Sequence, residues 1–215
     1  QTPEYFEYMA FPRLLAMSEV QWTLPEHKDF ESFARRLDKE FERLDYCGVN
    51  ACRNFYEVNQ TGAWNKSQQT YEVTLNTFCP DADIYYAVND STVNTSSSLY
   101  ETPIPLDEDA TIYSAVYRSG KPLGKVTRKS FAVNKATGCD YTCNPKAGWE
   151  HLNKGFGLTD GRRGYARDMR RWISFYQDTV QIVVELKKPQ KVKEVAFSSL
   201  WRPVNEIWPA RAMGV

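Results

Sequence analysis

The spacing of apolar residues changes once along this chain, and that change limits the folds open to it. Between Pro12 and Tyr46 the apolar residues recur at helical spacing, whereas from Tyr71 onward they alternate with polar ones. A period near 3.6 residues indicates helices, and a period of two indicates strands with one buried face. The chain is therefore predicted to be mainly β, with an α segment at its N-terminal end.

Two helices are expected in the first fifty residues. Pro12 suits the first position of a helix that runs from Arg13 to Gln21. A second helix is predicted from about Asp29 to Tyr46, with one apolar stripe and Gly48 at its C′ position. The first helix is apolar on nearly all sides, so it needs more cover than one neighbour supplies. We expect the chain to begin in the middle of a larger body.

Period-two patterns dominate the middle of the chain. Residues 71–78, 82–89, 110–120 and 125–133 are predicted strands, separated by segments rich in turn-forming residues. Short strands at this spacing favour an immunoglobulin-like β-sandwich over residues 67–134. Residues 53–66 are polar and irregular, which predicts a linker before the sandwich.

The last eighty residues begin with a loop and continue with three alternating runs. These runs, predicted to be strands, cover residues 172–177, 180–189 and 191–201. So short a stretch is expected to be an incomplete β domain, spanning residues 135–215.

The charge and cysteine content exclude several functions. The chain has 27 basic and 27 acidic residues, so no net charge attracts nucleic acid or an anionic membrane. No apolar run approaches the roughly 20 residues that cross a bilayer. The five cysteines form no CxxC pair and only two histidines are present, so we expect free, partly buried thiols rather than a zinc site. We therefore expect no nucleic-acid partner and no membrane span.

Three motifs in this order resemble the C-terminal part of a family-20 glycoside hydrolase, a β-N-acetylhexosaminidase or chitobiase. The final helix of its (β/α)8 barrel is similar to Pro12, Arg13, Ala16, Ser18, Glu19 and Trp22. Its immunoglobulin-like chitobiase C-terminal domain is similar to the residues Ile84, Tyr85, Tyr86, Tyr100, Pro103 and Ile104. The start of a discoidin (coagulation-factor C-type) jelly roll resembles Leu158, Asp160, Gly161, Arg163, Gly164, Trp172 and residues 184–197.

The resemblance implies four segments and one enzyme. Residues 1–52 would be the last barrel helices, 53–66 the linker, 67–134 the sandwich and 135–215 an incomplete discoidin-like domain. The parent enzyme would hydrolyse terminal N-acetylhexosamine from glycans by substrate-assisted, retaining catalysis, without a cofactor. Its catalytic Asp–Glu pair would precede residue 1, so this chain would be non-catalytic. It would pack against the missing barrel and be secreted, periplasmic or on the cell surface.

A few side chains are candidates for ligand binding. Trp149, His151, Arg162 and Arg163 combine an aromatic platform with planar polar groups, which suits carbohydrate. The resemblance implies that Asp160 could be a ligand of a structural Ca²⁺ ion.

Other interpretations stay open at this point. Asp160 and Gly161 could simply form a tight turn, and Glu19 is expected to be a helix carboxylate paired with Arg13 or a backbone amide. Trp201 and Trp208 could be structural or could bind a ligand. The alternative function is a carbohydrate-binding or spacer module without a catalytic role.

Overall fold

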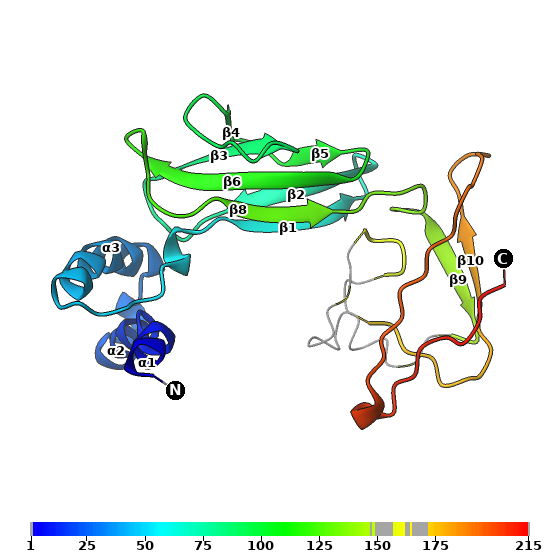
Figure 1. The fold of residues 1–215 in the computed structure, drawn as a ribbon, viewed down its shortest axis with the longest axis horizontal. Helices are drawn as coiled ribbons and strands as arrows, with labels where there is room; N and C mark the ends of the chain where they lie inside the picture. Colours follow the sequence, from blue (N-terminus) through cyan, green and yellow to red (C-terminus); the bar gives the residue numbers. More distant parts are fainter. Residues whose placement is uncertain (1, 147, 149–156, 162–163, 165–171, 215) are drawn as a thin grey trace. The chain divides into compact units, whose positions relative to one another are not determined.

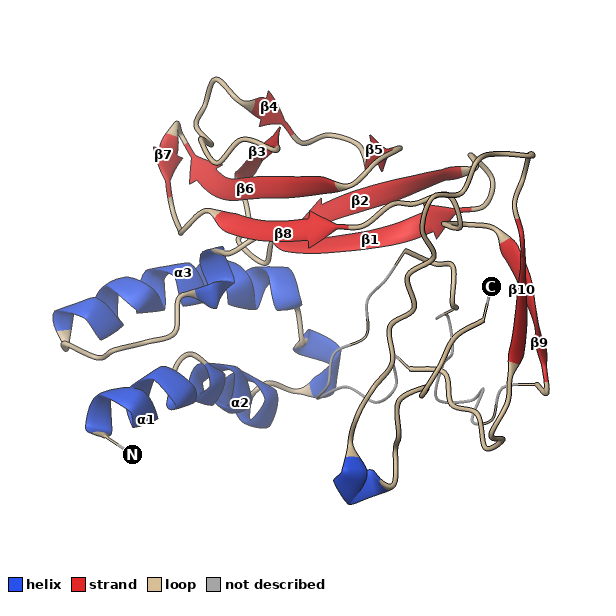
Figure 2. Ribbon diagram, turned by 45° about the vertical axis from the view of Figure 1, so that its right-hand side comes forward, coloured by secondary structure: helices blue, strands red, loops and turns tan. Residues whose placement is uncertain are grey.

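The computed structural model describes residues 2–146, 148, 157–161, 164 and 172–214. It is mainly β with a short N-terminal helical segment, and its antiparallel sheets are consistent with a β-sandwich (Figures 1 and 2). The helices are α1 (Pro3–Ala10), α2 (Arg13–Trp22) and α3 (Phe30–Tyr46), with 3-10 turns at Pro25–His27, Asn54–Tyr56 and Pro203–Asn205. The strands are β1 (Asn59–Asn65), β2 (Thr70–Asn76), β3 (Asp83–Val88), β4 (Ser98–Leu99), β5 (Ile104–Leu106), β6 (Ala110–Arg118), β7 (Lys121–Pro122), β8 (Thr127–Phe131), β9 (Asp140–Asn144) and β10 (Gln181–Glu185).

The chain divides into two compact units. The first unit contains Gln1–Thr61, Thr74–Pro103 and Thr111–Ser130, and the second contains Gly62–Val73, Ile104–Ala110 and Phe131–Val215. The segment boundaries expected at residues 52, 66 and 134 stay a prediction.

Helix α3 of the first unit confirms the amphipathic pattern. Its apolar stripe buries Ala34, Leu37 and Phe41, while the charged residues lie on the other sides. The helix begins after Asp29, whose Oδ1 accepts hydrogen bonds from the amides of Glu31 at 2.9 Å and Ser32 at 3.3 Å. An Asp at the N-cap satisfies amides that have no partner within the helix.

The C-terminal end of α3 also matches its sequence. Gly48 has φ +68°, a conformation that glycine adopts without steric cost. Its amide donates to the carbonyl of Asp45 at 3.0 Å, and the amide of Val49 donates to Leu44 at 2.9 Å. These two bonds form a Schellman motif, which satisfies the last carbonyls of the helix.

Helices α1 and α2 contrast with α3 because neither has a fully buried residue. The predicted helix after Pro12 is confirmed as α2, and α1 is an additional helix in front of it. The exposed apolar side chains on these helices are Tyr5, Phe6, Tyr8, Met9, Leu14, Met17, Val20 and Trp22. These apolar side chains of α1 and α2 are therefore exposed to solvent in the described structure.

The larger sheet has the order β4-β3-β6-β7, with β8 also paired to β6. Strand β6 is buried on both faces, because Ile112 and Val116 point one way and Ala115 and Tyr117 the other. The ring of Tyr117 packs edge-on against Tyr85 of β3, with ring centroids 5.3 Å apart. The predicted strands at 71–78, 82–89, 110–120 and 125–133 correspond to β2, β3, β6 and β8.

In the second unit, β2 pairs with β5 and β9 pairs with β10, both antiparallel, and β2 also has β1 as a neighbour. Val73 of β2 lies opposite Ile104 of β5, and Tyr71 lies opposite Leu106. Strands β9 and β10 pair from Asp140 with Glu185 to Asn144 with Gln181. Strand β10 lies within the strand predicted over residues 180–189, whereas β9 forms in a segment before the expected loop to which no strand was assigned.

Three further expectations about secondary structure are wrong. Residues 53–66 contain β1 instead of an irregular linker, because Gln60 is buried in the sheet and its polarity hides the pattern of a strand. Residues 172–177 form only a single bridge, between Ser174 and Gly148. Residues 191–201 form no strand, because a strand needs a hydrogen-bonding partner and none of the described segments pairs with them.

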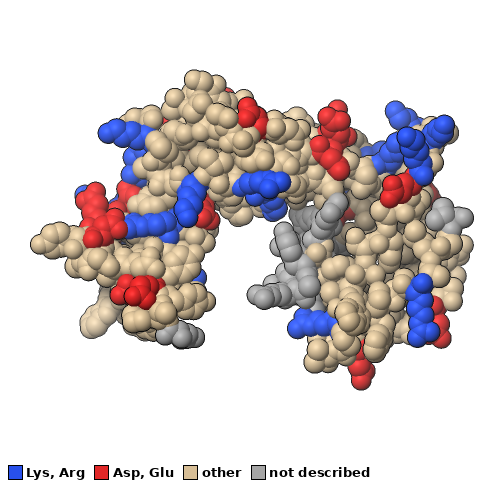
Figure 3. Space-filling model, viewed as in Figure 1, with Lys and Arg blue, Asp and Glu red and all other residues tan. Residues whose placement is uncertain are grey.

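All five cysteines lie in the described ranges and are free thiols, as expected. Cys52, Cys79 and Cys139 are buried, whereas Cys47 is exposed. Among the described helices, none is long and apolar enough to cross a membrane. Figure 3 shows basic and acidic side chains interspersed over the visible face, in keeping with the balanced composition.

Candidate functional site

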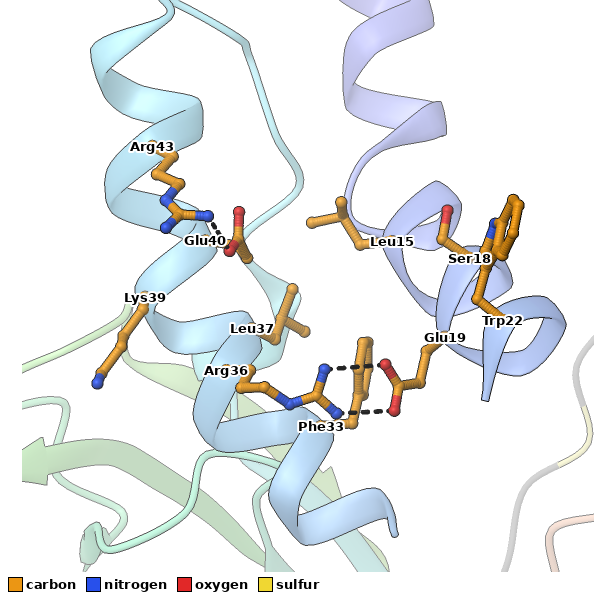
Figure 4. A pocket seen from close by; sticks show the side chains of 10 residues that line it. All are labelled: Leu15, Ser18, Glu19, Trp22, Phe33, Arg36, Leu37, Lys39, Glu40 and Arg43. Atoms are coloured by element: carbon orange, nitrogen blue, oxygen red, sulfur yellow. Dashed lines mark hydrogen bonds and ion pairs between the residues drawn. The ribbon is translucent and has the colours of Figure 1, made fainter. Parts of the chain in front are cut away.

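A groove of about 480 Å³ lies between α2 and α3 (Figure 4). Leu15 of α2 points toward α3, whereas the ring of Trp22 points away from it (Figure 4). The other lining residues are Ser18 and Glu19 of α2 and Phe33, Arg36, Leu37, Lys39, Glu40 and Arg43 of α3. The groove thus has an apolar floor and a charged rim.

An ion pair closes one side of this groove. The guanidinium of Arg36 donates to both oxygens of Glu19, at 2.7 and 2.9 Å, and the Glu19 side chain is only 19% exposed. This bond lowers the pKa of Glu19 below its ordinary value. The partner is Arg36 rather than Arg13, because six positions along one helix place Arg13 on another side, where it donates to the carbonyl of Met9.

The groove offers no general acid for glycoside hydrolysis among the described residues. A general acid must be protonated near neutral pH, whereas the low pKa of Glu19 keeps it ionised. The second carboxylate, on Glu40, accepts a bond of 2.7 Å from Arg43. The geometry therefore supports a structural role for Glu19, which joins α2 to α3.

A second polar cluster joins α3 to the sheet of the first unit. Asp38 accepts from the Tyr56 hydroxyl at 2.6 Å and from Nη1 of Arg118 at 2.5 Å. Nη2 of Arg118 also donates to the Cys79 sulfur at 3.0 Å and to the Pro80 carbonyl at 2.9 Å. The cluster connects a helix, a 3-10 turn, a loop and the end of β6.

Burial dominates the electrostatics of this cluster. It raises the pKa of the Tyr56 hydroxyl, and the bond to the Asp38 carboxylate raises it further. Burial likewise raises the pKa of the Cys79 thiol, which stays protonated and poorly nucleophilic at neutral pH. The cluster is therefore suited to holding elements together rather than to nucleophilic chemistry.

Sequence reasoning missed this cluster. Asp38 lies outside the apolar stripe of α3, where the sequence pattern predicts solvent exposure, but its side chain is only 23% exposed. Its partners Tyr56 and Arg118 are distant in sequence, and no local motif links a helix position to the end of a strand. Only the folded arrangement brings them together.

The loop that carries Asp160 is tightly hydrogen-bonded in the second unit. Asp160 Oδ2 accepts from the amide of Gly157 at 3.0 Å, and Gly161 adopts φ +72°. The carbonyl of Gly161 accepts from the Tyr71 hydroxyl at 3.3 Å, and that of Thr159 accepts from the amide of Gly138 at 2.7 Å. These contacts attach the loop to β2 and to the segment before β9.

The donor set around Asp160 fits a tight turn better than a cation site. Calcium takes six to eight oxygen ligands, typically several carboxylates and carbonyls. Here one Asp160 oxygen and both flanking carbonyls already accept hydrogen bonds from the protein. The described residues also contain no cluster of three acidic, His or Cys side chains that could hold a metal ion.

The remaining candidate binding residues fall into three sets. Trp149, His151, Arg162 and Arg163 lie outside the described residues. Trp172 is half-buried against Gly164, where an added Cβ would lie 2.4 Å from its ring, so it serves as packing. Trp201 and Trp208 are exposed.

Comparison with known proteins identifies two similarities. Residues 73–131 match a family described as Fn3 associated, and they lie within the sandwich predicted over 67–134. A 49-residue stretch is 51% identical to a beta-hexosaminidase from Porphyromonas gingivalis (strain ATCC BAA-308 / W83). The match covers 23% of this chain and only 6% of the relative's length. Part of this chain is therefore related to part of a beta-hexosaminidase.

Proposed function

We propose that this chain is the non-catalytic C-terminal part of a family-20 β-N-acetylhexosaminidase. The observation that carries the proposal is the 51% identity to a beta-hexosaminidase over 49 residues. The motif order, from barrel helix to immunoglobulin-like sandwich to incomplete discoidin-like jelly roll, agrees with this assignment. The whole protein would release terminal N-acetylhexosamine from glycans by substrate-assisted, retaining catalysis with an Asp–Glu pair that precedes residue 1.

The uncovered face of α1 and α2 supports a preceding barrel domain. Trp22 at the end of α2 is 88% exposed, and Met17 and Val20 of the same helix are also exposed. Large apolar side chains exposed in this number on two neighbouring helices typically mark an interface. We propose that this face packs against the barrel of the same protein.

The alternative proposal is a carbohydrate-binding or spacer module. Exposed tryptophans near the C-terminal end favour binding over a pure spacer. Trp149, His151, Arg162 and Arg163 remain proposed carbohydrate-binding residues, whereas for Asp160 we propose a tight turn in place of the Ca²⁺ site that the resemblance implies. Secretion, a periplasmic location or display on the cell surface belongs to the same proposal, since glycan substrates lie outside the cell.

Enzyme assays on two proteins test the proposal. The full-length protein and residues 1–215 alone are each incubated with p-nitrophenyl N-acetyl-β-glucosaminide, and release of nitrophenol is followed. We expect hydrolysis by the full-length protein and none by residues 1–215. Activity of residues 1–215 alone would contradict the proposal that the catalytic Asp–Glu pair precedes residue 1. An inactive full-length protein would favour the alternative proposal of a carbohydrate-binding module.

A further inference from the structure

Residues 201–208 form a small hairpin in the second unit. The amide of Arg202 donates to the carbonyl of Ile207 at 2.9 Å, and the amide of Ile207 donates back at 3.2 Å. Two further bonds hold the tip, from Asn205 to Arg202 and from Glu206 to Pro203, each 3.0 Å long. The four bonds fix the backbone between Trp201 and Trp208.

The hairpin places both tryptophans on one face. In an antiparallel pair, residues directly opposite each other point to the same side, and successive residues alternate. Arg202 and Ile207 are opposite each other and half-buried, so Trp201 and Trp208 point to the other side. Both are exposed there, at 68% and 69%. Because Pro203 and Pro209 fix φ at their positions, little backbone freedom remains to be lost on binding.

We propose that Trp201 and Trp208 form a platform on which pyranose rings of N-acetylhexosamine glycans stack. This inference rests on the proposed function for its ligand class. An aromatic face packs well against the C–H groups of a sugar, and an acetamido methyl group adds apolar contact. The turn between the tryptophans also carries an amide on Asn205 and a carboxylate on Glu206, which suit sugar hydroxyls.

The local charge favours a neutral glycan over an anionic partner. Between positions 201 and 210 the only basic residue is Arg202, and Glu206 balances it. Nucleic acids and anionic membranes are bound through clusters of Lys and Arg, which this hairpin does not have. A flat aromatic surface with balanced charge instead matches an uncharged sugar.

Hydroxyl-radical footprinting of the full-length protein tests the platform residue by residue. The probe is chitotriose with sulfur in its glycosidic linkages, which resists hydrolysis by the proposed enzyme. We expect Trp201 and Trp208 to be oxidised readily without the probe and protected when it is added. Low oxidation without the probe would mean that another part of the protein covers them, and oxidation without protection would mean that they bind no glycan; either result overturns the proposal.

Alanine variants of the two tryptophans test whether each one contributes to the affinity for the probe. We expect Trp201→Ala to raise the probe concentration needed to protect Trp208 about tenfold, and Trp208→Ala to do the same for Trp201. Tyr46→Ala removes an exposed aromatic side chain at the end of α3, outside the α1 and α2 face, and should change neither midpoint. Hydrolysis of the nitrophenyl substrate is measured in parallel. Activity without protection overturns only the platform, whereas protection without activity overturns only the proposed enzyme.

Discussion

At the scale of single residues, two glycines with the same backbone conformation have different surroundings. Gly161 and Gly120 have φ +72° and +75°. A Cβ at Gly161 would lie 2.6 Å from the Tyr71 ring, whereas one at Gly120 would meet nothing within 4 Å. The first glycine is therefore required by both conformation and packing, and the second by conformation alone.

Alanine substitutions separate these two requirements. We expect Gly120→Ala to lower the free energy of unfolding by about 1 kcal/mol, the cost of a left-handed conformation. Gly161→Ala should cost about 2–4 kcal/mol, because overpacking against Tyr71 is added. Urea unfolding of both variants measures the difference, and equal losses would contradict the close contact of Gly161 with Tyr71.

Asp38 provides a second test at this scale, because its carboxylate accepts from both Tyr56 and Arg118. Asp38→Asn should lower the free energy of unfolding by about 1–3 kcal/mol, since hydrogen bonds to a charged group are weakened. The control is Arg35→Gln, which removes the exposed pair with Asp81 and should have little effect. If chemical denaturation ranks the two variants the other way, the cluster does not hold α3 to the sheet.

At the scale of elements, the sequence predicted those segments whose burial alternates cleanly. Helix α3 and strands β2, β3 and β6 have regular apolar patterns, so periodicity alone located them. Strand β1 was missed because its inward-facing Gln60 is polar. The side-chain amide of Gln60 donates to Ser114 at 2.8 Å and to the carbonyls of Ile112 and Thr127. These bonds offset the cost of its burial. Apolar and polar side chains alternate along residues 191–201, but this segment pairs with no described strand. Alternation indicates that a segment could form a strand, and it does not show which segment would pair with it.

The ion pair between Glu19 of α2 and Arg36 of α3 predicts that the stability of the chain depends on pH. Glu19 has a folded-state pKa below its ordinary value of 4.5 because Arg36 bonds to its carboxylate. A lowered pKa contributes stability above the unfolded-state pKa, and this contribution is lost as the pH falls through the folded-state pKa. We expect Glu19→Gln to lower the melting temperature at pH 7 but to match the wild type once the pH is below the folded-state pKa.

The control for this experiment is Glu26→Gln. Glu26 lies in the 3-10 turn after α2, and the described structure shows no ion pair for it. Its substitution should leave the melting temperature nearly unchanged at every pH. A Glu19→Gln deficit that persists at low pH would mean that packing, rather than the ion pair, joins the helices.

At the scale of the molecule, the sequence predicted the class of the chain better than its site. The expectation of a mainly β chain after an α segment is confirmed. The tight turn at Asp160 was one of the alternatives that the sequence left open, but the contact of Gly161 with Tyr71 was not predictable, because only the tertiary structure brings these distant residues together. The apolar character of α2 and its need for cover were readable from the sequence, and the structure agrees, since neither α1 nor α2 has a buried residue.

Substitutions on the exposed face of α1 and α2 are expected to affect stability differently in the isolated chain and in the full-length protein. In the isolated chain, Val20→Asp and Trp22→Asp should leave the unfolding free energy within about 0.5 kcal/mol, because both side chains are exposed. Self-association should decrease, since an apolar surface becomes charged. In the full-length protein the same substitutions should cost about 3–5 kcal/mol, because each would bury an unpaired charge against the barrel.

Thermal unfolding and analytical ultracentrifugation of both forms measure these effects. The matched control is Tyr46→Asp, at the end of α3, where the side chain is 93% exposed and lies outside the α1 and α2 face. This variant should be neutral in both forms. If Val20→Asp and Trp22→Asp are also neutral in the full-length protein, the face remains in solvent there, and the proposal that α2 is the last helix of a preceding barrel is wrong.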